Sequence, residues 1–328
     1  MNEYRGKHAP SHPWPVASTA SVPSRRGRHQ KRSRRRRVGF FIVILLVLLM
    51  IAYPFIEPKI ITVNHQKYSD AKLRLPSNME YLRVVYVSDI HWGHWFSDWD
   101  LDRLAVRINE LYPDILVFGG DYAVDFESAV DFFSRLQKYK FNTRLVTCGV
   151  LGESDYIGED VAVSRLTDAM KNAGVIPLVD DKITFPLTIY NETDPQATER
   201  FRICIVGADD YLSGSSDLKS LSALSAVSSS DYVIFLSHNP AVITTVQKQT
   251  DYWFDLALFG HTHGGQVPVV SDLLEISEEV SEYYMKKAGQ LFEESKSHLL
   301  LSRGIGTSVI PCRLFCFPEI NCIDICPD

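Results

Sequence analysis

Four short apolar runs in the chain are each followed within a few residues by a polar turn. The runs are rich in valine, isoleucine, leucine and aromatic residues, which is typical of buried strands, and they span 81–87, 115–118, 232–236 and 256–259. In an open α/β sheet, ligands bind beyond the carboxyl ends of the strands. The pattern therefore predicts an α/β fold with a binding site where these four strand ends meet.

The polar residues that follow the runs are two aspartates and four histidines: Asp89, His91, Asp121, His238, His261 and His263. A single aspartate or histidine at such a position is more often a cap, a turn former or an ordinary buried side chain. Seven histidines lie beyond residue 56, however, and four of them fall at these strand ends, which chance placement would rarely produce. A mixed nitrogen and oxygen set of this size predicts a hydrolytic centre with two divalent metal ions.

The strand ends carry distinct motifs: Asp-x-His at 89–91, Gly-Gly-Asp at 119–121, Ser-His-Asn-Pro at 237–240 and Gly-His-Thr-His-Gly-Gly-Gln at 260–266. Their order resembles that of the calcineurin-like metallophosphoesterases. It is most similar to the membrane-anchored branch, which also has segments like 206–210, 303–308 and 315–320. The resemblance covers residues 81 to 325 and implies a four-layer αββα sandwich, in which helices flank two central sheets.

The resemblance also implies a role for each metal ligand. It assigns Asp89, His91 and His263 to one ion, His238 and His261 to the other, and Asp121 to a bridging position between them. The two divalent ions are predicted to be manganese, with iron or zinc as alternatives. His94 is predicted to bind the substrate.

The chain departs from the family pattern at one motif, where Gly152-Glu153-Ser154-Asp155 replaces Gly-Asn-His-Asp. Glu153 can take the place of the ligating asparagine with a charged oxygen, but Ser154 cannot replace the histidine beside the leaving group as a general acid, whose help is worth about 10²–10⁴-fold. A phosphate leaving group, with a pKa near ~6, departs without a proton. We therefore predict that Asp121, Glu153 and Ser154 belong to a catalytic site for a pyrophosphate bond. A degenerate metal-binding protein is the alternative.

Residues 38–56 form a run of nineteen residues without a charge, long enough to cross a bilayer. No small-residue cleavage site follows, so we predict an uncleaved membrane anchor rather than a signal peptide. Residues 1–37 are predicted to be a disordered basic tail, with nine basic residues among the last thirteen, and 57–76 a short linker to a catalytic domain at 77–328. The basic flank favours a cytoplasmic position next to anionic lipid of the inner membrane.

The charge of the remaining chain limits the class of substrate. Residues 1–37 hold eleven of the 34 Lys and Arg and one of the 40 Asp and Glu, so the rest has a net charge of −16. This charge repels nucleic acid, whereas a lipid-linked phosphate is presented by the bilayer itself. The chain resembles most closely the UDP-2,3-diacylglucosamine pyrophosphatases of lipid A synthesis, which release lipid X and UMP. A spanning helix with a cytoplasmic basic tail places the domain outside, which favours an external lipid or cell-wall phosphate as the alternative.

The last four cysteines have the spacing C-x3-C-x5-C-x3-C, which matches no common zinc pattern. Residues 321–326 alternate between apolar and polar positions as a terminal strand does. We therefore predict buried free thiols in a strand, with a disulfide or zinc cluster as the alternative.

Overall fold

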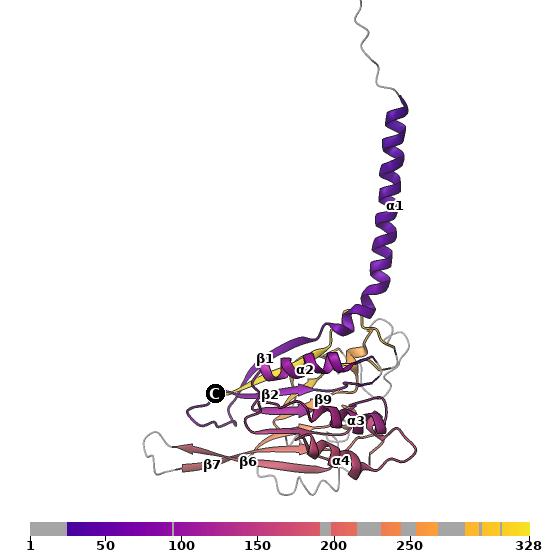
Figure 1. The fold of residues 1–328 in the computed structure, drawn as a ribbon. Helices are drawn as coiled ribbons and strands as arrows, with labels where there is room; N and C mark the ends of the chain where they lie inside the picture. The colour runs from indigo at the N-terminus through magenta and orange to yellow at the C-terminus, as the bar shows by residue number, and fades with distance from the viewer. Residues whose placement is uncertain are drawn as a thin grey trace, which may run out of the picture. The chain divides into compact units, whose positions relative to one another are not determined.

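The computed structural model describes residues 25–93, 95–190, 198–214, 231–243, 254–267, 286–294, 297–308 and 310–328, with the backbone alone at 25–33, 190 and 198–199. The chain divides into two compact units, residues 1–51 and 52–328. The helices and strands are drawn in Figure 1.

The first unit consists, in its described part, of a long helix that continues into the second unit. Helix α1, Arg25–Ile56, contains an apolar stretch long enough to cross a membrane, although a signal sequence passes the same test of length and composition. All described side chains from residue 34 to residue 52 are exposed. The helix begins at Arg25, so part of the tail predicted to be disordered is helical.

Two sheets of six strands each form the centre of the second unit, counted over the described residues. The first sheet has the order β1 (Thr62–Asp70), β12 (Glu319–Pro327), β2 (Leu82–Val87), β3 (Ile115–Phe118), β4 (Val146–Gly149) and β5 (Ile176–Pro177). The second has the order β10 (Leu291–Glu294), β11 (Ser297–Leu301), β9 (Leu256–Phe259), β8 (Tyr232–Leu236), β7 (Thr198–Gly207) and β6 (Asp181–Tyr190). The strands that precede the candidate ligands, β2 and β3 in one sheet and β8 and β9 in the other, are parallel neighbours.

The alternation of side chains along the strands builds two cores at once. Val84 and Tyr86 of β2 belong to the buried cluster between the two sheets, whereas Val85 and Val87 belong to the cluster on the outer face of the first sheet. This is the period of two that a strand buried on both faces requires.

Helices α2 (Asp98–Glu110), α3 (Phe126–Leu136) and α4 (Val163–Asn172) supply the outer cluster with their apolar faces. The α/β sandwich is thus as predicted for the two sheets and this helical layer. The outer face of the second sheet carries a third apolar cluster, and the segments that follow its strands lie mostly outside the described residues.

The region predicted to be a linker, 57–76, is instead largely part of the fold. A short 3-10 helix, η1 (Glu57–Lys59), leads into β1, which pairs in parallel with β12 from Thr62 to Asp70. The sequence of β1 is polar because the strand lies at the edge of its sheet and is only half buried. Its strand character was therefore missed, and the catalytic domain begins close to the end of α1.

The C-terminal residues form the predicted strand, and it lies between β1 and β2. It pairs in parallel with β1 and antiparallel with β2. All six cysteines are free, and Cys148, Cys204, Cys316 and Cys322 are buried. Among the last four cysteines, the prediction of buried free thiols is confirmed for Cys316 and Cys322, whereas Cys312 and Cys326 are free but only partly buried.

Candidate metal centre

The candidate ligands lie in tight turns at the ends of β2, β3, β8 and β9. Five of the nine described non-glycine residues with positive φ are candidate ligands: Asp89, His91, Asp121, His261 and His263. Such backbone conformations cost about 1–3 kcal/mol each and persist where the surrounding structure enforces them, often at functional sites. Here the turns are tied to one another, because the backbone N–H groups of Asp89 and His91 donate to the carbonyl oxygens of Gly120 and Asp121 at 3.0 and 3.1 Å.

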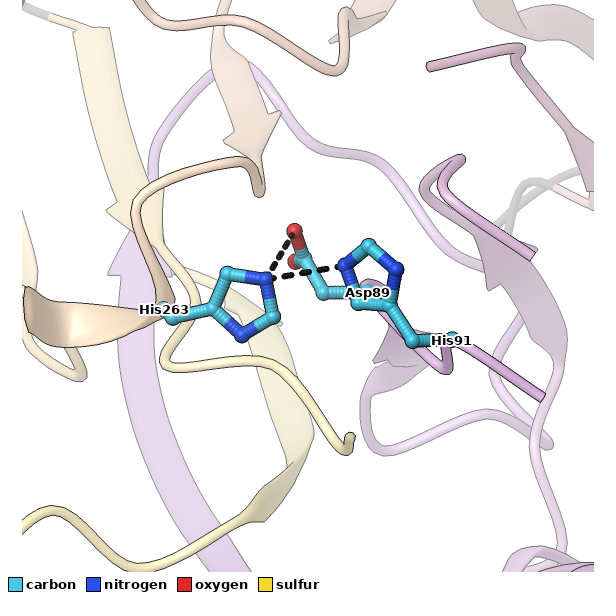
Figure 2. Close-up of side chains that lie close together, drawn as sticks. All are labelled: Asp89, His91 and His263. Carbon is cyan, nitrogen blue, oxygen red and sulfur yellow. Dashed lines mark hydrogen bonds and ion pairs between the residues drawn. The ribbon is translucent and has the colours of Figure 1, made fainter. Parts of the chain in front are cut away.

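Asp89, His91 and His263 form the first group of possible metal ligands (Figure 2). The Nε2 atoms of His91 and His263 lie 3.0 Å apart, and His263 Nε2 lies 3.5 Å from Asp89 Oδ1. All three side chains are buried. Two imidazole nitrogens and a carboxylate oxygen that face a common point form a donor set suited to a transition metal ion.

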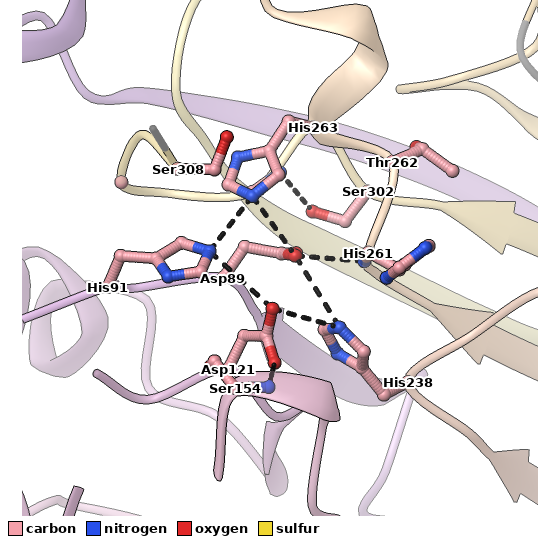
Figure 3. A network of polar contacts seen from close by, with 12 residues as sticks. Asp89, His91, Asp121, Ser154, His238, His261, Thr262, His263, Ser302 and Ser308 are labelled. Carbon is pink, nitrogen blue, oxygen red and sulfur yellow. Dashed lines mark hydrogen bonds and ion pairs between the residues drawn. The ribbon is translucent and has the colours of Figure 1, made fainter. Parts of the chain in front are cut away.

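Asp89, Asp121 and His238 form a second group (Figure 3). Asp121 Oδ2 lies 3.3 Å from His238 Nε2 and 3.5 Å from His91 Nε2, so this carboxylate stands between the two groups. Asp89 Oδ1 lies 3.9 Å from His238 Nε2. Asp89 therefore belongs to both groups, whereas the resemblance assigned it to one ion only.

The buried atoms of this centre fit a cation. Within the part of the chain that the structure describes, Asp89 Oδ2 and His238 Nε2 are both buried without a hydrogen-bond partner, which is unfavourable unless another group satisfies them. The Nδ1 atom of His238 lies 2.7 Å from the carbonyl oxygen of Gly119, an arrangement that directs a free Nε2 lone pair toward Asp121. When bound there, a pair of divalent ions polarises phosphoryl oxygens and activates water as the nucleophile.

The pKa values of three candidate ligands, Asp121, His238 and His263, are shifted from their ordinary values in different directions. Burial by itself would raise the pKa of Asp121, but His238 and His91 hold it well below the ordinary value. Burial by itself would lower the pKa of His238, but Asp121 raises it well above the ordinary value. Burial and the neighbouring His91 lower the pKa of His263. Metal ligands must be deprotonated, so metal binding at His238 opposes the protonation that its raised pKa favours in the metal-free centre.

Asp155 holds the turn that carries Asp121. Its carboxylate accepts hydrogen bonds from the backbone N–H groups of Gly152, Asp121 and Tyr122 at 2.9, 3.0 and 3.0 Å. Burial and the nearby Asp121 carboxylate raise the pKa of Asp155 above its ordinary value, while these backbone bonds oppose the rise. Asp155 lies within the altered motif Gly152-Glu153-Ser154-Asp155, and no role was predicted for it.

Arg313 is the second residue that sequence reasoning missed. It is fully buried, and its Nη2 lies 3.3 Å from Nδ1 of the candidate ligand His263. Arg313 Nη1 donates to the carbonyl oxygen of Arg303 at 2.7 Å, and Nε donates to that of Gly306 at 3.0 Å. No local pattern marks it, because residues 311–314 have the composition of an ordinary loop.

The remaining predicted site residues are placed as follows. The backbone N–H of His261 donates to Asp89 Oδ1 at 2.9 Å, and its ring lies edge-on to that of His238 with centroids 5.4 Å apart. Glu153 lies in the 3-10 helix η2, Glu153–Tyr156, half buried, and no described contact joins its carboxylate to a candidate ligand. Ser154 is buried beside Asp121. His94 lies outside the described residues.

Residues 82–265, more than half of the 328 residues, match the family described as calcineurin-like phosphoesterase. The chain belongs to this family of metal-dependent hydrolases, which use a dinuclear metal site. Membership of this family is consistent with the α/β sandwich and with the position of the candidate metal ligands at the ends of its strands.

Three relatives illustrate which members of the family the chain is similar to. The chain is 27% identical over 272 residues to an uncharacterized metallophosphoesterase, YkuE, from Bacillus subtilis, covering 81% of this chain and 86% of YkuE. It is 31% identical over 202 residues to a transmembrane protein with metallophosphoesterase domain from Bos taurus, covering 59% of this chain but 43% of the bovine protein. It is 26% identical over 245 residues to the UDP-2,3-diacylglucosamine pyrophosphatase LpxG from Chlamydia trachomatis, covering 65% and 72%. The apolar helix and the transmembrane relative together indicate a membrane anchor.

Proposed function

We propose that the protein is a membrane-anchored phosphohydrolase with two manganese ions that cleaves the pyrophosphate bond of a lipid-linked nucleotide. The substrate that fits best is UDP-2,3-diacylglucosamine, which would yield lipid X and UMP. The observation that carries this proposal is the environment of Ser154, at the position where the family has a histidine. A relative with this activity supports it without establishing it.

Ser154 has a structural role in the site but no means of supplying a proton. Its backbone N–H donates to Asp121 Oδ1 at 2.9 Å and so orients the carboxylate between the two ligand groups. Its hydroxyl is buried and has no hydrogen-bond partner among the described residues. A hydroxyl in such a place does not ionise near neutral pH, so the leaving group has to depart as an anion. A nucleotide phosphate does so readily, with a pKa near ~6, whereas a sugar or alkyl alkoxide does not.

A second candidate is a phosphoesterase that acts on an external lipid or cell-wall phosphate. It is favoured by the nine basic residues ahead of the apolar run, which favour a cytoplasmic position for that end and therefore the other side of the membrane for the catalytic domain. A UDP-linked lipid precursor is made inside the cell, so the two candidates differ in the face of the membrane on which the domain lies.

The substrate is tested with the purified full-length protein in lipid nanodiscs with Mn²⁺. UDP-2,3-diacylglucosamine is compared with an alkyl phosphodiester, an aryl phosphodiester and single-stranded DNA, with Asp121→Ala as the inactive control. We expect release of UMP from the lipid and no turnover of DNA. The kcat/KM for the pyrophosphate should be at least about 100-fold above that for the alkyl phosphodiester, since general acid catalysis, which the alkyl ester needs, is worth ~10²–10⁴-fold. Turnover of the esters without release of UMP would favour the second candidate. Protease digestion of the domain in intact cells identifies the face of the membrane independently.

The role of Ser154 is tested by two substitutions. Ser154→Ala should change turnover of the pyrophosphate less than about tenfold, because the hydroxyl supplies no proton. Ser154→His should raise the rate for the alkyl phosphodiester relative to the pyrophosphate. An unchanged ratio of the two rates in the histidine variant would show that acid catalysis does not explain this motif.

A further inference from the structure

The end of helix α1 is fastened directly to the catalytic domain. The backbone N–H of Arg313 donates to the carbonyl oxygen of Pro54 at 2.9 Å, and the rings of Tyr53 and Phe315 lie 6.3 Å apart. The carboxylate of Glu57 is fully buried and accepts a hydrogen bond from the backbone N–H of Phe315 at 3.0 Å. The last residues of helix α1, from 53 on, therefore pack within the unit that carries the metal centre.

A cavity of about 140 Å³ opens beside this junction. Its walls combine the end of the apolar helix with two loops of the domain, and its main lining residues are Phe55, Pro58, Trp95, Phe96, Thr307 and Pro311. Most of these side chains are apolar. The cavity thus has the composition of a site for a hydrocarbon chain.

The position of the cavity along the chain sets its depth relative to a membrane. The apolar run ends at Ile56, and Lys59, which also lines the cavity, follows three residues later. Three residues span at most about 11 Å. The headgroup region of a bilayer is roughly 5–8 Å thick on each side of the hydrocarbon core. Where residues 38–56 cross the bilayer, the connectivity of the chain therefore keeps Lys59, and with it this part of the cavity lining, within about 11 Å of the hydrocarbon core.

Two residues with exposed aromatic side chains contact the segment 53–59. Trp95 is half exposed at the cavity rim, and Lys59 Nζ donates to its carbonyl oxygen at 2.5 Å. Phe315 is 79% exposed although it contacts the helix end. Tryptophan is enriched at the membrane interface, and a large apolar side chain exposed there is covered by lipid rather than water.

Thr307 adds a hydroxyl group to the cavity lining, in addition to the ammonium group of Lys59. The residue is 4% exposed, and its hydroxyl has no hydrogen-bond partner among the described residues, which is unfavourable for a buried polar atom. The residue before it, Gly306, donates its backbone N–H to the carbonyl oxygen of Asp89 at 2.7 Å. The cavity wall is thus bonded directly to a turn that carries a candidate metal ligand.

We propose that this cavity receives the first part of an acyl chain of the lipid substrate, and that the hydroxyl of Thr307 donates to the acyl carbonyl oxygen. The substrate then keeps its remaining hydrocarbon in the bilayer while its phosphate reaches the metal centre. This proposal rests on the proposed function, because it requires a substrate that carries an acyl chain. It adds the site that recognises that chain.

The test compares substrates that share the nucleotide but differ in the acyl chain. Rates are measured in nanodiscs for the diacyl lipid and for a water-soluble UDP-sugar without acyl chains, in the wild type and in Trp95→Ala, Thr307→Val and Thr307→Ser. We expect Trp95→Ala to lower kcat/KM for the lipid about tenfold relative to the soluble substrate, which corresponds to about 1.4 kcal/mol. Thr307→Val should lower the same ratio about threefold to tenfold, and Thr307→Ser should restore it.

Trp99 provides the matched control, since it is an exposed tryptophan of α2 that does not line the cavity. We expect Trp99→Ala to leave the ratio of lipid to soluble rates unchanged. An equal decrease of the ratio of lipid to soluble rates in Trp95→Ala and Trp99→Ala would show that tryptophan acts through general contact with the bilayer and not through the cavity. That result, or an unchanged ratio in both Trp95→Ala and Thr307→Val, would overturn the proposal.

A binding measurement separates failure of the cavity from failure of the substrate assignment. Phosphatidic acid with brominated acyl chains is added to the full-length protein, and quenching of each tryptophan is taken from the difference between the wild type and its phenylalanine variant. Stronger quenching of Trp95 than of Trp99 supports the cavity even if no pyrophosphate lipid is hydrolysed, and the substrate assignment then fails alone. Equal or weaker quenching of Trp95 overturns the cavity even if the lipid is hydrolysed.

Discussion

Replacing Arg313 by methionine should weaken both the folded state and the binding of one metal ion. The guanidinium group donates to the carbonyl oxygens of Gly306, Arg303 and Cys316 at 3.0, 2.7 and 3.2 Å. Its Nη2 also lies 3.3 Å from Nδ1 of His263. Methionine preserves much of the apolar stem but has no N–H donor. Arg313→Met thus removes one common donor from three carbonyl oxygens, together with the group that packs against the ring of His263.

The magnitude follows from these lost partners. Each buried acceptor left unsatisfied costs about 1–3 kcal/mol, and part of that cost is offset because a buried guanidinium no longer has to be desolvated. We expect the free energy of unfolding to fall by about 3–5 kcal/mol, the range found when one partner of a buried charged cluster is removed. When Nε2 of His263 binds a metal ion, Nδ1 carries the proton, so the guanidinium 3.3 Å away limits rotation of the ring by contact and not by a hydrogen bond. Loss of this contact should lower metal affinity by at most the roughly 10–100-fold found for hydrogen-bonded partners of metal ligands.

Two measurements check this prediction. Urea denaturation of the chelated protein gives the change in the free energy of unfolding, and competition with a chromophoric chelator gives the change in metal affinity. Arg107→Met is the matched control, because Arg107 is an exposed arginine of α2 with no described contact to the metal centre. That control should change stability by less than about 1 kcal/mol and leave metal affinity unchanged.

Either of two results would refute the reasoning. A free energy of unfolding for Arg313→Met within about 1 kcal/mol of the wild-type value would show that the buried carbonyl oxygens find other hydrogen-bond partners. The cost of about 1–3 kcal/mol for each unsatisfied acceptor would then not apply here. Lower stability with unchanged metal affinity would show that Arg313 supports the loop but does not orient His263.

Three further predictions concern the anchor and the centre. Deleting residues 1–51 should release the protein from membranes with its metal content intact. Deleting residues 1–60 also removes the buried Glu57 and should lower the Tm by roughly 5–10 °C relative to the shorter deletion. Equal Tm values of the two deletion variants in calorimetry would contradict this. Asp121→Ala should lose both metal ions in elemental analysis, since its carboxylate lies between the two ligand groups, and a retained pair would remove the bridging assignment. The pKa of His238 is raised in the folded state, so its contribution to stability is full below the unfolded value and is lost as the pH rises through the folded value. In chelated protein, the difference in unfolding free energy between the wild type and His238→Gln should therefore shrink above about pH 6.5, and a difference that grows with pH would contradict the direction of the shift.

The amino-acid sequence alone determined the chemistry at the strand ends. Apolar runs that end in Asp89, Asp121 and His238 are local patterns, and parallel strands bring their carboxyl ends together in any α/β sandwich. The C-terminal strand was also predictable, because residues 321–326 alternate strictly. These features depend on neighbours in the chain, which a sequence displays directly.

Only the tertiary structure decided which residues support the centre and how the anchor joins it. Strand β1 is polar because it lies at an edge, so its pattern resembles a linker until its pairing with β12 is known. The contacts that join Arg313 to His263 and Glu57 to Phe315 cross 50 and 258 residues of sequence, and no local periodicity records a partner at such separation. Asp89 likewise joins both ligand groups only because two sheets pack with their strand ends together. The ligand types follow from local chemistry, whereas the sharing of Asp89 and the support of the centre by distant residues follow from packing.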